Sequence, residues 1–136
     1  MLERTFSMVK PDAVLQCQIG EIIKRLETAS LKVVALQMMQ LRKEIAEQFY
    51  HVHSHRPFFK DLVSFICSGS VVAMVLEGED AVLKTRALIG ATHPKEAEKG
   101  TIRSDFGTSI EKNAIHASDS KETAGFEISV FFPGLS

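Results

Sequence analysis

The residues best suited to chemistry in this chain lie in the segment Asn-Ala-Ile-His-Ala-Ser-Asp at positions 113–119. His116 follows a strand-forming isoleucine and precedes residues that favour turns and helix caps. A histidine held in this way can act as a nucleophile that carries a group covalently. It can equally be a structural histidine with satisfied hydrogen bonds, and this segment alone does not separate the two interpretations.

Glu127 is a candidate partner for His116, because it lies on the stretch that follows and that is predicted to be helical. Its neighbours Phe126, Ile128 and Phe131 are apolar, so its carboxylate is expected to be at least partly buried and to need a partner. Pairing with the imidazole would fix the tautomer and leave the other ring nitrogen free to attack. An exposed helix face for Glu127 is the alternative, and the spacing is compatible with both.

Several basic residues are candidates for binding an anion. Lys10 lies where a predicted strand ends, Arg103 lies in a glycine-containing loop, and Arg86 lies near the end of the helix that runs into that loop. A triphosphate needs several such donors at once, because its charge is spread over many oxygens. Taken one by one, each of these residues is most simply a solvated surface charge. The full candidate set is Lys10, Arg56, Arg86, Arg103 and Lys112.

Common phosphate-binding motifs are absent from the sequence. There is no GxxxxGK[ST] loop, the glycines are too scattered for a dinucleotide fingerprint, and the catalytic-loop signature of protein kinases is missing. The alternating His51, His53 and His55 could suggest a metal site. The predicted helix ends there, beside Arg56, so a loop without metal is the favoured interpretation.

Two aromatic residues have open assignments. Phe58 follows Arg56-Pro57 and belongs by default to the core, but an exposed phenyl ring beside an arginine could instead stack on a nucleotide base. Tyr50 is the only tyrosine, and its hydroxyl is either a satisfied polar group of the core or a donor in a functional site.

The composition is that of an ordinary globular protein, with 45% hydrophobic residues, 24% charged residues and a formal net charge of −1. The length of 136 residues predicts one domain over residues 1–136. Without a basic surplus, non-specific nucleic-acid binding is not favoured.

No apolar stretch is long enough for a membrane span or typical of a secretion signal. Cys17 and Cys67 lie far apart, so reduced thiols in a cytoplasmic protein are expected.

Hydrophobic periodicity predicts helices that alternate with a few strands, which is typical of a single sheet covered by helices. Pattern alone does not fix the strand order. Asp119 and Glu122 resemble a capping box at the start of the last helix. A long loop over residues 89–112 is expected to be functional. The predicted strands are 4–9, 31–41, 71–76 and 113–117, and the predicted helices are 20–29, 43–51, 58–67, 79–88 and 120–132.

The chain resembles the nucleoside diphosphate kinases over nearly its whole length and in the order and spacing of the motifs. The Lys-Pro-Asp motif and the Asn-x-x-His-x-Ser-Asp signature are highly specific together. The resemblance is carried by residues 5–14 (TFSMVKPDAV), 56–59 (RPFF), 76–79 (LEGE), 90–94 (GATHP), 100–103 (GTIR) and 113–119 (NAIHASD).

The resemblance implies an α+β fold, a ferredoxin-like α/β sandwich with a four-stranded antiparallel sheet covered by helices. It implies ping-pong transfer of the γ-phosphate of a nucleoside triphosphate, typically ATP, to a nucleoside diphosphate through a phosphohistidine. It also implies Mg²⁺ held mainly by the nucleotide phosphates, with no direct protein ligand. A cytoplasmic homo-oligomer is expected, with a tetramer or hexamer favoured, and neither a specific nucleic acid nor a membrane is an expected partner.

Family roles carry over to matching positions of this sequence. His116 would be the nucleophile, attacking through Nδ1, with Glu127 hydrogen-bonded to the ring. Tyr50 and Ser118 would support the histidine and the moving phosphoryl group. The residues that would contact the nucleotide are Lys10, Arg86, Thr92, Arg103 and Asn113 at the phosphates and sugar, and Phe58 and Ile110 on either side of the base.

Ala117 departs from the family pattern, because glycine usually follows the histidine. The extra methyl group could restrict the backbone or crowd the site. The alternative function is therefore a catalytically weakened, nucleotide-binding regulatory module on the same fold. A pure protein-interaction domain is a third and weaker interpretation.

Overall fold

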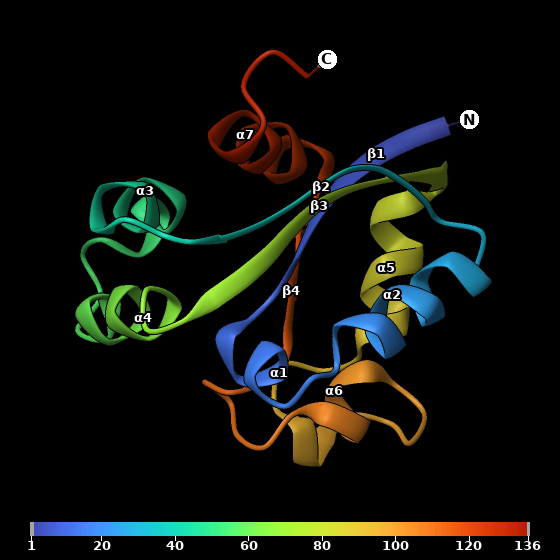
Figure 1. Cartoon of the computed structure of the whole chain (residues 1–136), viewed down its shortest axis with the longest axis horizontal. Coiled ribbons are helices and arrows are strands. Elements are labelled where there is room, and N and C mark those ends of the chain that lie inside the picture. The colour runs from blue at the N-terminus through green and yellow to red at the C-terminus, as the bar shows by residue number, and fades with distance from the viewer. Residues whose placement is uncertain (1, 136) are drawn as a thin grey trace.

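The computed structural model describes residues 2–135, which form an α+β fold around a four-stranded antiparallel sheet (Figure 1). The strand order is β2-β3-β1-β4, so β2 and β4 are the edge strands. The strands are β1 (Leu2–Val9), β2 (Lys32–Gln40), β3 (Ser70–Glu79) and β4 (Ile115–Ala117).

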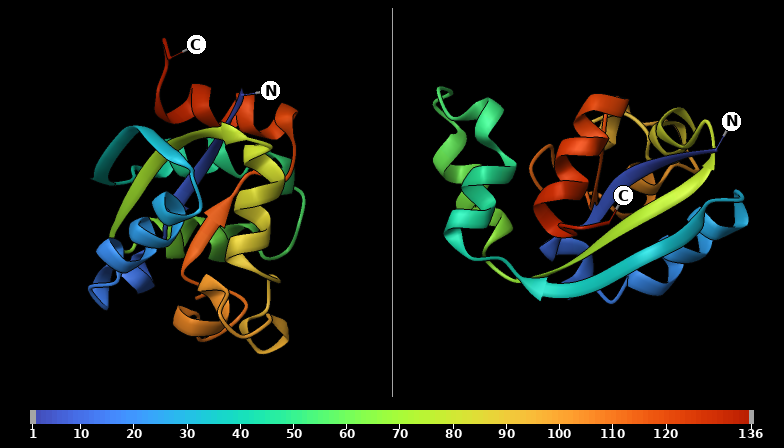
Figure 2. Two further views of the ribbon diagram at one scale, coloured as in Figure 1. Left: turned by 90° about the vertical axis from the view of Figure 1, so that its right-hand side faces the viewer. Right: turned by 90° about the horizontal axis from the view of Figure 1, so that it is seen from above.

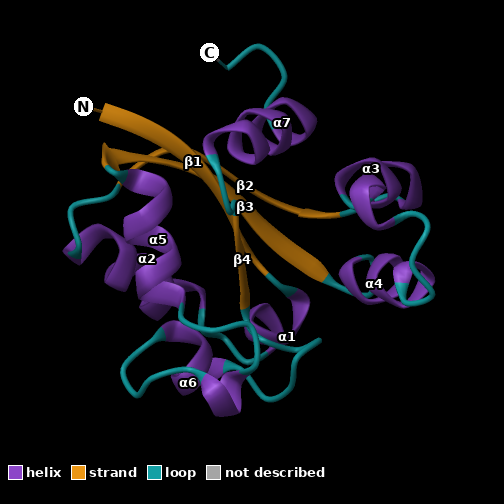
Figure 3. Cartoon of the chain, turned by 180° about the vertical axis from the view of Figure 1, so that it is seen from behind, coloured by secondary structure: helices purple, strands orange, loops and turns teal. Residues whose placement is uncertain are grey.

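Helices cover both faces of the sheet (Figures 1 and 2). One buried cluster lies between the sheet and α2 and α5, and the other lies between the sheet and α3, α4 and α7. Figure 3 shows the same division from behind, with α1 and α6 near the end of the sheet at which β4 begins. The helices are α1 (Pro11–Leu15), α2 (Ile19–Thr28), α3 (Lys43–Phe49), α4 (Phe59–Ile66), α5 (Ala81–Ile89), α6 (Ile102–Phe106) and α7 (Lys121–Phe131), with short 3₁₀ turns at His51–His53 and Pro94–Glu96.

The central strand β3 explains how the two clusters share one sheet. Val71, Ala73 and Val75 belong to the cluster beneath α3, α4 and α7. The alternate residues Val72 and Met74 belong to the cluster beneath α2 and α5. A strand with both faces buried reads as a continuous apolar run, and each such side chain contributes about 1.5–3 kcal/mol when fully buried.

Local sequence fixes the two points at which the chain leaves β1 and enters α7. Pro11 cannot donate a ladder hydrogen bond but suits the first turn of a helix, so β1 ends at Val9 and α1 begins at Pro11. At α7 the N-cap is Ser120, whose hydroxyl accepts a hydrogen bond from the Thr123 amide at 3.1 Å. The predicted capping box began one residue too early, at Asp119.

The elements lie close to their predicted positions, with three differences. The short helix α1 (Pro11–Leu15) was not predicted. The long loop of residues 89–112 contains the short helix α6 and a 3₁₀ turn, which were not predicted. The last strand is also shorter than predicted, because Asn113 and Ala114 form a turn before β4 begins. Within residues 2–135, no helix combines the length and apolar character needed to cross a membrane.

Candidate active site

His116 lies at the middle of the edge strand β4, opposite Met8 of β1. Its side chain is 21% exposed. The ring packs edge-on against Phe49 of α3, with centroids 4.9 Å apart, and lies 6.0 Å from the ring of Phe6. Packing against the rings of Phe49 and Phe6 therefore limits the orientations that the imidazole can adopt.

Glu127 of α7 holds the imidazole through Nε2. The distance from His116 Nε2 to Glu127 Oε1 is 2.9 Å, and the glutamate is buried. A carboxylate can only accept this hydrogen bond, so the proton lies on Nε2 and the neutral ring keeps a lone pair on Nδ1. The predicted burial of Glu127 and its pairing with His116 are both seen, and Nδ1 is the nitrogen left available.

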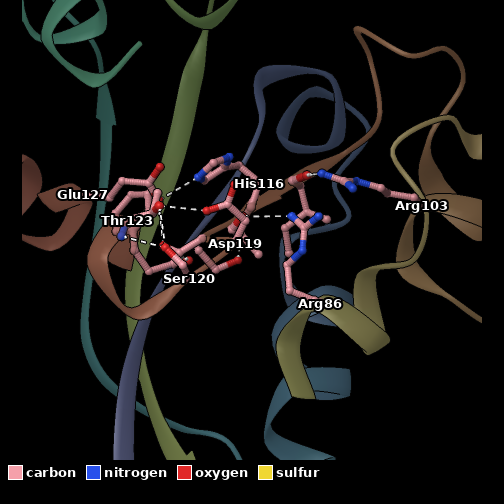
Figure 4. A network of polar contacts seen from close by, with 12 residues as sticks. Arg86, Arg103, His116, Asp119, Ser120, Thr123 and Glu127 are labelled. Carbon is pink, nitrogen blue, oxygen red and sulfur yellow. Dashed lines mark hydrogen bonds and ion pairs between the residues drawn. The ribbon is translucent and has the colours of Figure 1, made fainter. Parts of the chain in front are cut away.

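Ser118 fixes the same carboxylate from a second direction. Its hydroxyl donates to Glu127 Oε1 at 2.6 Å, and its side chain is buried. One oxygen of Glu127 therefore accepts from both His116 and Ser118, which limits rotation of the carboxylate. Figure 4 shows this network, in which Asp119 and Ser120 lie beside Thr123 at the start of α7. The Thr123 hydroxyl donates to Asp119 Oδ1 at 2.7 Å.

Two arginines bind the free edge of β4 on either side of His116. Arg103 of α6 donates to the carbonyl oxygen of Ile115 at 2.9 Å, and Arg86 of α5 donates to the carbonyl oxygen of Ala117 at 3.2 Å. These carbonyls have no strand to pair with on that side, because β4 is an edge strand, and the two arginines provide donors instead. Both guanidinium groups thus approach the strand that carries His116 from the side opposite Glu127 (Figure 4).

Lys10 completes a cluster of cations. Its ammonium group donates to Asn113 Oδ1 at 2.8 Å, and the residue is only 8% exposed. Burial and repulsion by Arg103 lower the pKa of Lys10 to about 8, and the charges of Asp12 and Glu111 oppose part of this shift. Burial and the charge of Arg86 lower the pKa of Arg103 to about 10. Arg103 therefore lies close enough to both Lys10 and Arg86 for repulsion to disfavour its charge or theirs.

No carboxylate of residues 2–135 forms an ion pair with Lys10, Arg86 or Arg103. A protein rarely buries several like charges without counter-ions, because desolvation and repulsion both disfavour the arrangement. Such a cluster is suited to an anionic ligand that supplies the missing negative charge. The arrangement can therefore bind a polyphosphate next to a histidine with a free Nδ1.

A cavity of about 380 Å³ opens beside His116. The predicted residues that line it are Tyr50, Arg86, His116 and Glu127. Tyr50 is buried, and burial together with the charge of Glu127 raises the pKa of its hydroxyl, so the phenol stays protonated and can donate. The other lining residues are Phe49, Val52, His53, Ala117, Asp119 and Thr123.

The remaining predicted residues form a second group and two outliers. The Asn113 amide donates to the carbonyl oxygen of Thr92 at 2.9 Å, which links Thr92 through Asn113 to Lys10. Phe58 is 42% exposed and lies under the guanidinium of Arg56, so it is not a core residue. Ile110 is 60% exposed.

Ala117 does not need the conformational freedom of glycine. It lies in β4, paired with Ser7, and it is not among the described residues with positive φ. Its side chain is buried in the cluster beneath α2 and α5. The expected restriction of the backbone is therefore not present, and a methyl group is compatible with the strand.

Sequence reasoning missed three features of this region. Phe49 was expected only as part of a helix, yet its ring packs against His116. His53 was weighed as a metal ligand, but it lines the cavity beside His116. Asp12 was part of a recognised motif without an assigned role, and its carboxylate accepts a hydrogen bond from the Ala114 amide at 3.0 Å. Its place in the Lys-Pro-Asp motif was the available signal.

Comparisons with known proteins show the family and the fold of the chain. The family described as nucleoside diphosphate kinase matches residues 3–135. Nucleoside diphosphate kinases of Delftia acidovorans and Burkholderia thailandensis are 58% and 59% identical, each over 99% of this chain and 96% of the relative. The structure of the Aquifex aeolicus nucleoside diphosphate kinase superposes with a TM-score of 0.96 at 48% identity, covering 98% of this chain and 97% of that one. The Halobacterium salinarum enzyme in complex with CDP superposes with a TM-score of 0.94 at 48% identity, covering 97% and 88%.

Proposed function

The chain belongs to the nucleoside diphosphate kinase family, and we propose that His116 is the residue that carries the phosphoryl group between its two nucleotides. The protein is a phosphotransferase that acts on nucleoside tri- and diphosphates. The observation that supports the role of His116 most directly is its hydrogen bond from Nε2 to Glu127, which leaves Nδ1 as the nucleophile.

The proposed reaction has two half-reactions. In the first, the lone pair of His116 Nδ1 forms a bond to the γ-phosphorus, and the bond to the bridging oxygen breaks, so a nucleoside diphosphate leaves. In the second, a terminal phosphate oxygen of another nucleoside diphosphate attacks the phosphohistidine and regenerates the free ring. Glu127 stabilises the positive charge that develops on the imidazole, because its carboxylate accepts a hydrogen bond from the Nε2–H group throughout.

The cations would provide most of the remaining catalysis. Phosphoryl transfer proceeds through a loose transition state whose charge lies on the equatorial oxygens, so positioning and charge neutralisation dominate. Lys10, Arg86 and Arg103 would supply the positive charge that neutralises these oxygens. Asn113 and Thr92 would help to place the phosphates and the sugar. Tyr50 and Ser118 complete the proposed site as a donor in the cavity and as a support for Glu127.

The base would be held by stacking on Phe58, with Ile110 on the other side. Both side chains are exposed, and stacking does not distinguish base edges. The proposed enzyme would therefore accept several bases.

Mg²⁺ would bind mainly to the nucleotide phosphates. Within residues 2–135, no group of three or more His, Cys, Asp or Glu side chains is arranged to hold a metal ion. Mg²⁺ commonly binds through few carboxylates together with substrate phosphates and water, so an ion carried by the nucleotide phosphates does not need a cluster of protein carboxylates. The ion would neutralise part of the phosphate charge during transfer.

The remaining parts of the proposal concern assembly and location. Residues 1–136 would act as one domain in a cytoplasmic homo-oligomer, with a tetramer or hexamer favoured. The edge strand β2 supports an assembly, because it exposes Leu36 and Met38. The free thiols of Cys17 and Cys67 are compatible with a reducing compartment. Light scattering in solution tests the assembly.

The experiment that tests the function is formation and discharge of a phosphoenzyme. Incubation with γ-labelled ATP and Mg²⁺ should give an acid-labile phosphoprotein, and either ADP or GDP should remove the label and yield labelled triphosphate. A catalytically weakened module would bind nucleotide and stabilise the fold on melting without accumulating label. Absence of a label that either diphosphate can discharge would contradict the proposal.

Replacement of Glu127 by glutamine should weaken chemistry more than nucleotide binding. The amide can still accept from Nε2, but its neutral oxygen stabilises the imidazolium-like phosphohistidine less well. We expect kcat to fall roughly ten- to a hundredfold with KM changed by less than about threefold. Steady-state kinetics provide the measurement, with Glu122→Gln on the same helix as a control. Unchanged kcat in Glu127→Gln would exclude an electrostatic role for the carboxylate.

Ala117→Gly should have little effect on turnover, because the strand conformation at this position suits any residue. We expect kcat within about twofold of the wild-type value and a loss of stability of about 0.5–1 kcal/mol from the added backbone freedom. Kinetics and chemical denaturation measure the two quantities. A large gain in kcat would show instead that the methyl group crowds the bound phosphate.

A further inference from the structure

Asp12 makes a contact that the proposed reaction does not use. It is the third residue of the Lys-Pro-Asp motif and lies in the first turn of α1. Its Oδ2 atom accepts a hydrogen bond from the backbone amide of Ala114 at 3.0 Å, and this contact is partly buried. Burial raises the pKa of the carboxyl group, while hydrogen bonds from backbone amides, including that of Ala114, oppose the shift.

Ala114 has a strained backbone. Its φ is +76°, in the region that L-residues other than Asn and Asp rarely occupy. The amide of Ile115 donates to the carbonyl oxygen of Asn113 at 2.9 Å, so these three residues form a γ-turn centred on Ala114. A positive φ at the centre identifies the strained form of this turn. Such a conformation persists only where its surroundings hold it in place.

Two contacts from the end of β1 and the start of α1 hold the turn. The Lys10 amide donates to the carbonyl oxygen of Ala114 at 2.9 Å, and Asp12 accepts from the amide of the same residue. Both polar groups of Ala114 are thus fixed by the Lys-Pro-Asp segment. The hydrogen bond to Asp12 is charge-assisted and is therefore the stronger of the two.

The turn separates the two halves of the site. Before it, the Asn113 side chain meets the ammonium group of Lys10 at 2.8 Å. After it, β4 begins at Ile115 and places His116 two residues beyond the centre of the turn. A relaxed backbone at Ala114 would shift Asn113 and Lys10 relative to His116. Displacements of about 1 Å in such a site can cost a hundredfold in rate.

We propose that Asp12 is a positioning residue, whose carboxylate holds the strained γ-turn at Ala114 and so sets the Lys10–Asn113 pair against His116. The inference rests on the proposed role of His116 as the phosphate carrier. It assigns to Asp12 an effect on catalysis through the backbone, without contact with the nucleotide.

A stabilising effect on α1 is the simpler alternative, because an acidic residue in the first turn of a helix interacts favourably with the helix dipole. Asp61 offers a matched control for this effect. It also lies in the first turn of a helix, α4, and its side chain is exposed. Asp61→Ala should therefore reproduce the loss of a first-turn charge without any loss of positioning.

The experiment compares Asp12→Ala, Asp12→Asn, Asp61→Ala and the double variant Asp12→Ala/Ala114→Gly in steady-state and phosphoenzyme assays. We expect kcat to fall roughly ten- to a hundredfold in Asp12→Ala, with an intermediate value for Asp12→Asn, whose amide oxygen can still accept. Glycine adopts positive φ without the penalty of a Cβ atom, so the double variant should recover most of the lost kcat. The amide proton of Ala114 should also shift upfield in the NMR spectrum of Asp12→Ala.

The outcomes separate this inference from the proposed function. A wild-type protein that forms no phosphoenzyme would overturn both. A wild-type phosphoenzyme combined with a kcat for Asp12→Ala within twofold of wild type would overturn the positioning role alone. So would an equal loss in Asp61→Ala, or a double variant no faster than Asp12→Ala. If Asp12→Ala does not fold, Asp12→Asn, with and without Ala114→Gly, carries the same comparison.

Discussion

His116→Ala should abolish phosphoenzyme formation and reduce the rate of phosphoryl transfer by at least about 10⁴-fold. Removal of a covalent nucleophile leaves only binding and charge neutralisation, which do not supply a group to carry the phosphate. Nucleotide affinity should change little, because the cations of the site remain. Labelling with γ-labelled ATP, single-turnover kinetics and nucleotide-dependent melting measure the three effects.

The other histidines provide the control for this experiment. His55 is exposed and lies outside the cavity, so His55→Ala should be labelled like the wild type. His53 lines the cavity beside His116 and is the only other histidine that does so among residues 2–135. Label that persisted in His116→Ala at the wild-type level would show that another residue carries the phosphate, and His53 would be the first candidate.

The fold was largely predictable from the sequence because its signals are local. The apolar run from Val71 to Leu76 predicts a strand with both faces buried, and Pro11 marks the end of β1. The two short helical segments of the loop were missed, because three to five residues are too few to show periodicity. Their cap signals were present, however: the Thr101 side chain accepts from the Ser104 amide at the start of α6.

The candidate site divides in the same way. The residue types and motifs predicted His116, Glu127 and the cations, and local pattern suggested that Glu127 would be buried. The choice of Nε2 by Glu127 depends on how α7 packs against the sheet, which joins residues by tertiary contact. The strained turn at Ala114 was not predictable, because alanine gives no local signal for positive φ and the conformation is imposed by Asp12 and Lys10.

Lys10 has the clearest conflict between function and stability. Its ammonium group has the neutral Asn113 as its hydrogen-bond partner. Burial and then repulsion by Arg103 outweigh the attraction of Asp12 and Glu111, so its pKa falls from 10.5 to about 8. A depression of this size corresponds to about 3 kcal/mol against the charged form in the folded protein. Between pH 8 and 10.5 the unfolded chain keeps a proton that the folded protein releases. Stability of the unliganded protein should therefore rise with pH through this window.

Lys10→Met should separate the two roles. Methionine fills a similar volume without charge, so we expect the unliganded variant to be more stable than the wild type at pH 7 by about 1–3 kcal/mol. The gain is smaller than the full cost of charging Lys10, because Asn113 loses its hydrogen-bond donor. We expect kcat/KM to fall by about 10²–10³, because one donor to the transferring phosphate is lost. Denaturation at pH 7 to 10.5, with and without nucleotide, and steady-state kinetics measure both effects.

Comparison with an exposed lysine makes the result specific to burial. Lys24 of α2 is exposed, so Lys24→Met should change neither kcat/KM nor the pH dependence of unfolding. The difference in stability between wild type and Lys10→Met should shrink as pH rises from 8, since the wild-type protein then sheds the unfavourable charge. Bound nucleotide should reverse the order of stability, because its phosphates place further negative charge beside Lys10, Arg86 and Arg103, none of which forms an ion pair with a carboxylate of residues 2–135. A Lys10→Met protein that is less stable than the wild type at every pH, with or without nucleotide, would contradict this prediction. It would mean that Lys10 stabilises the fold even without bound phosphate.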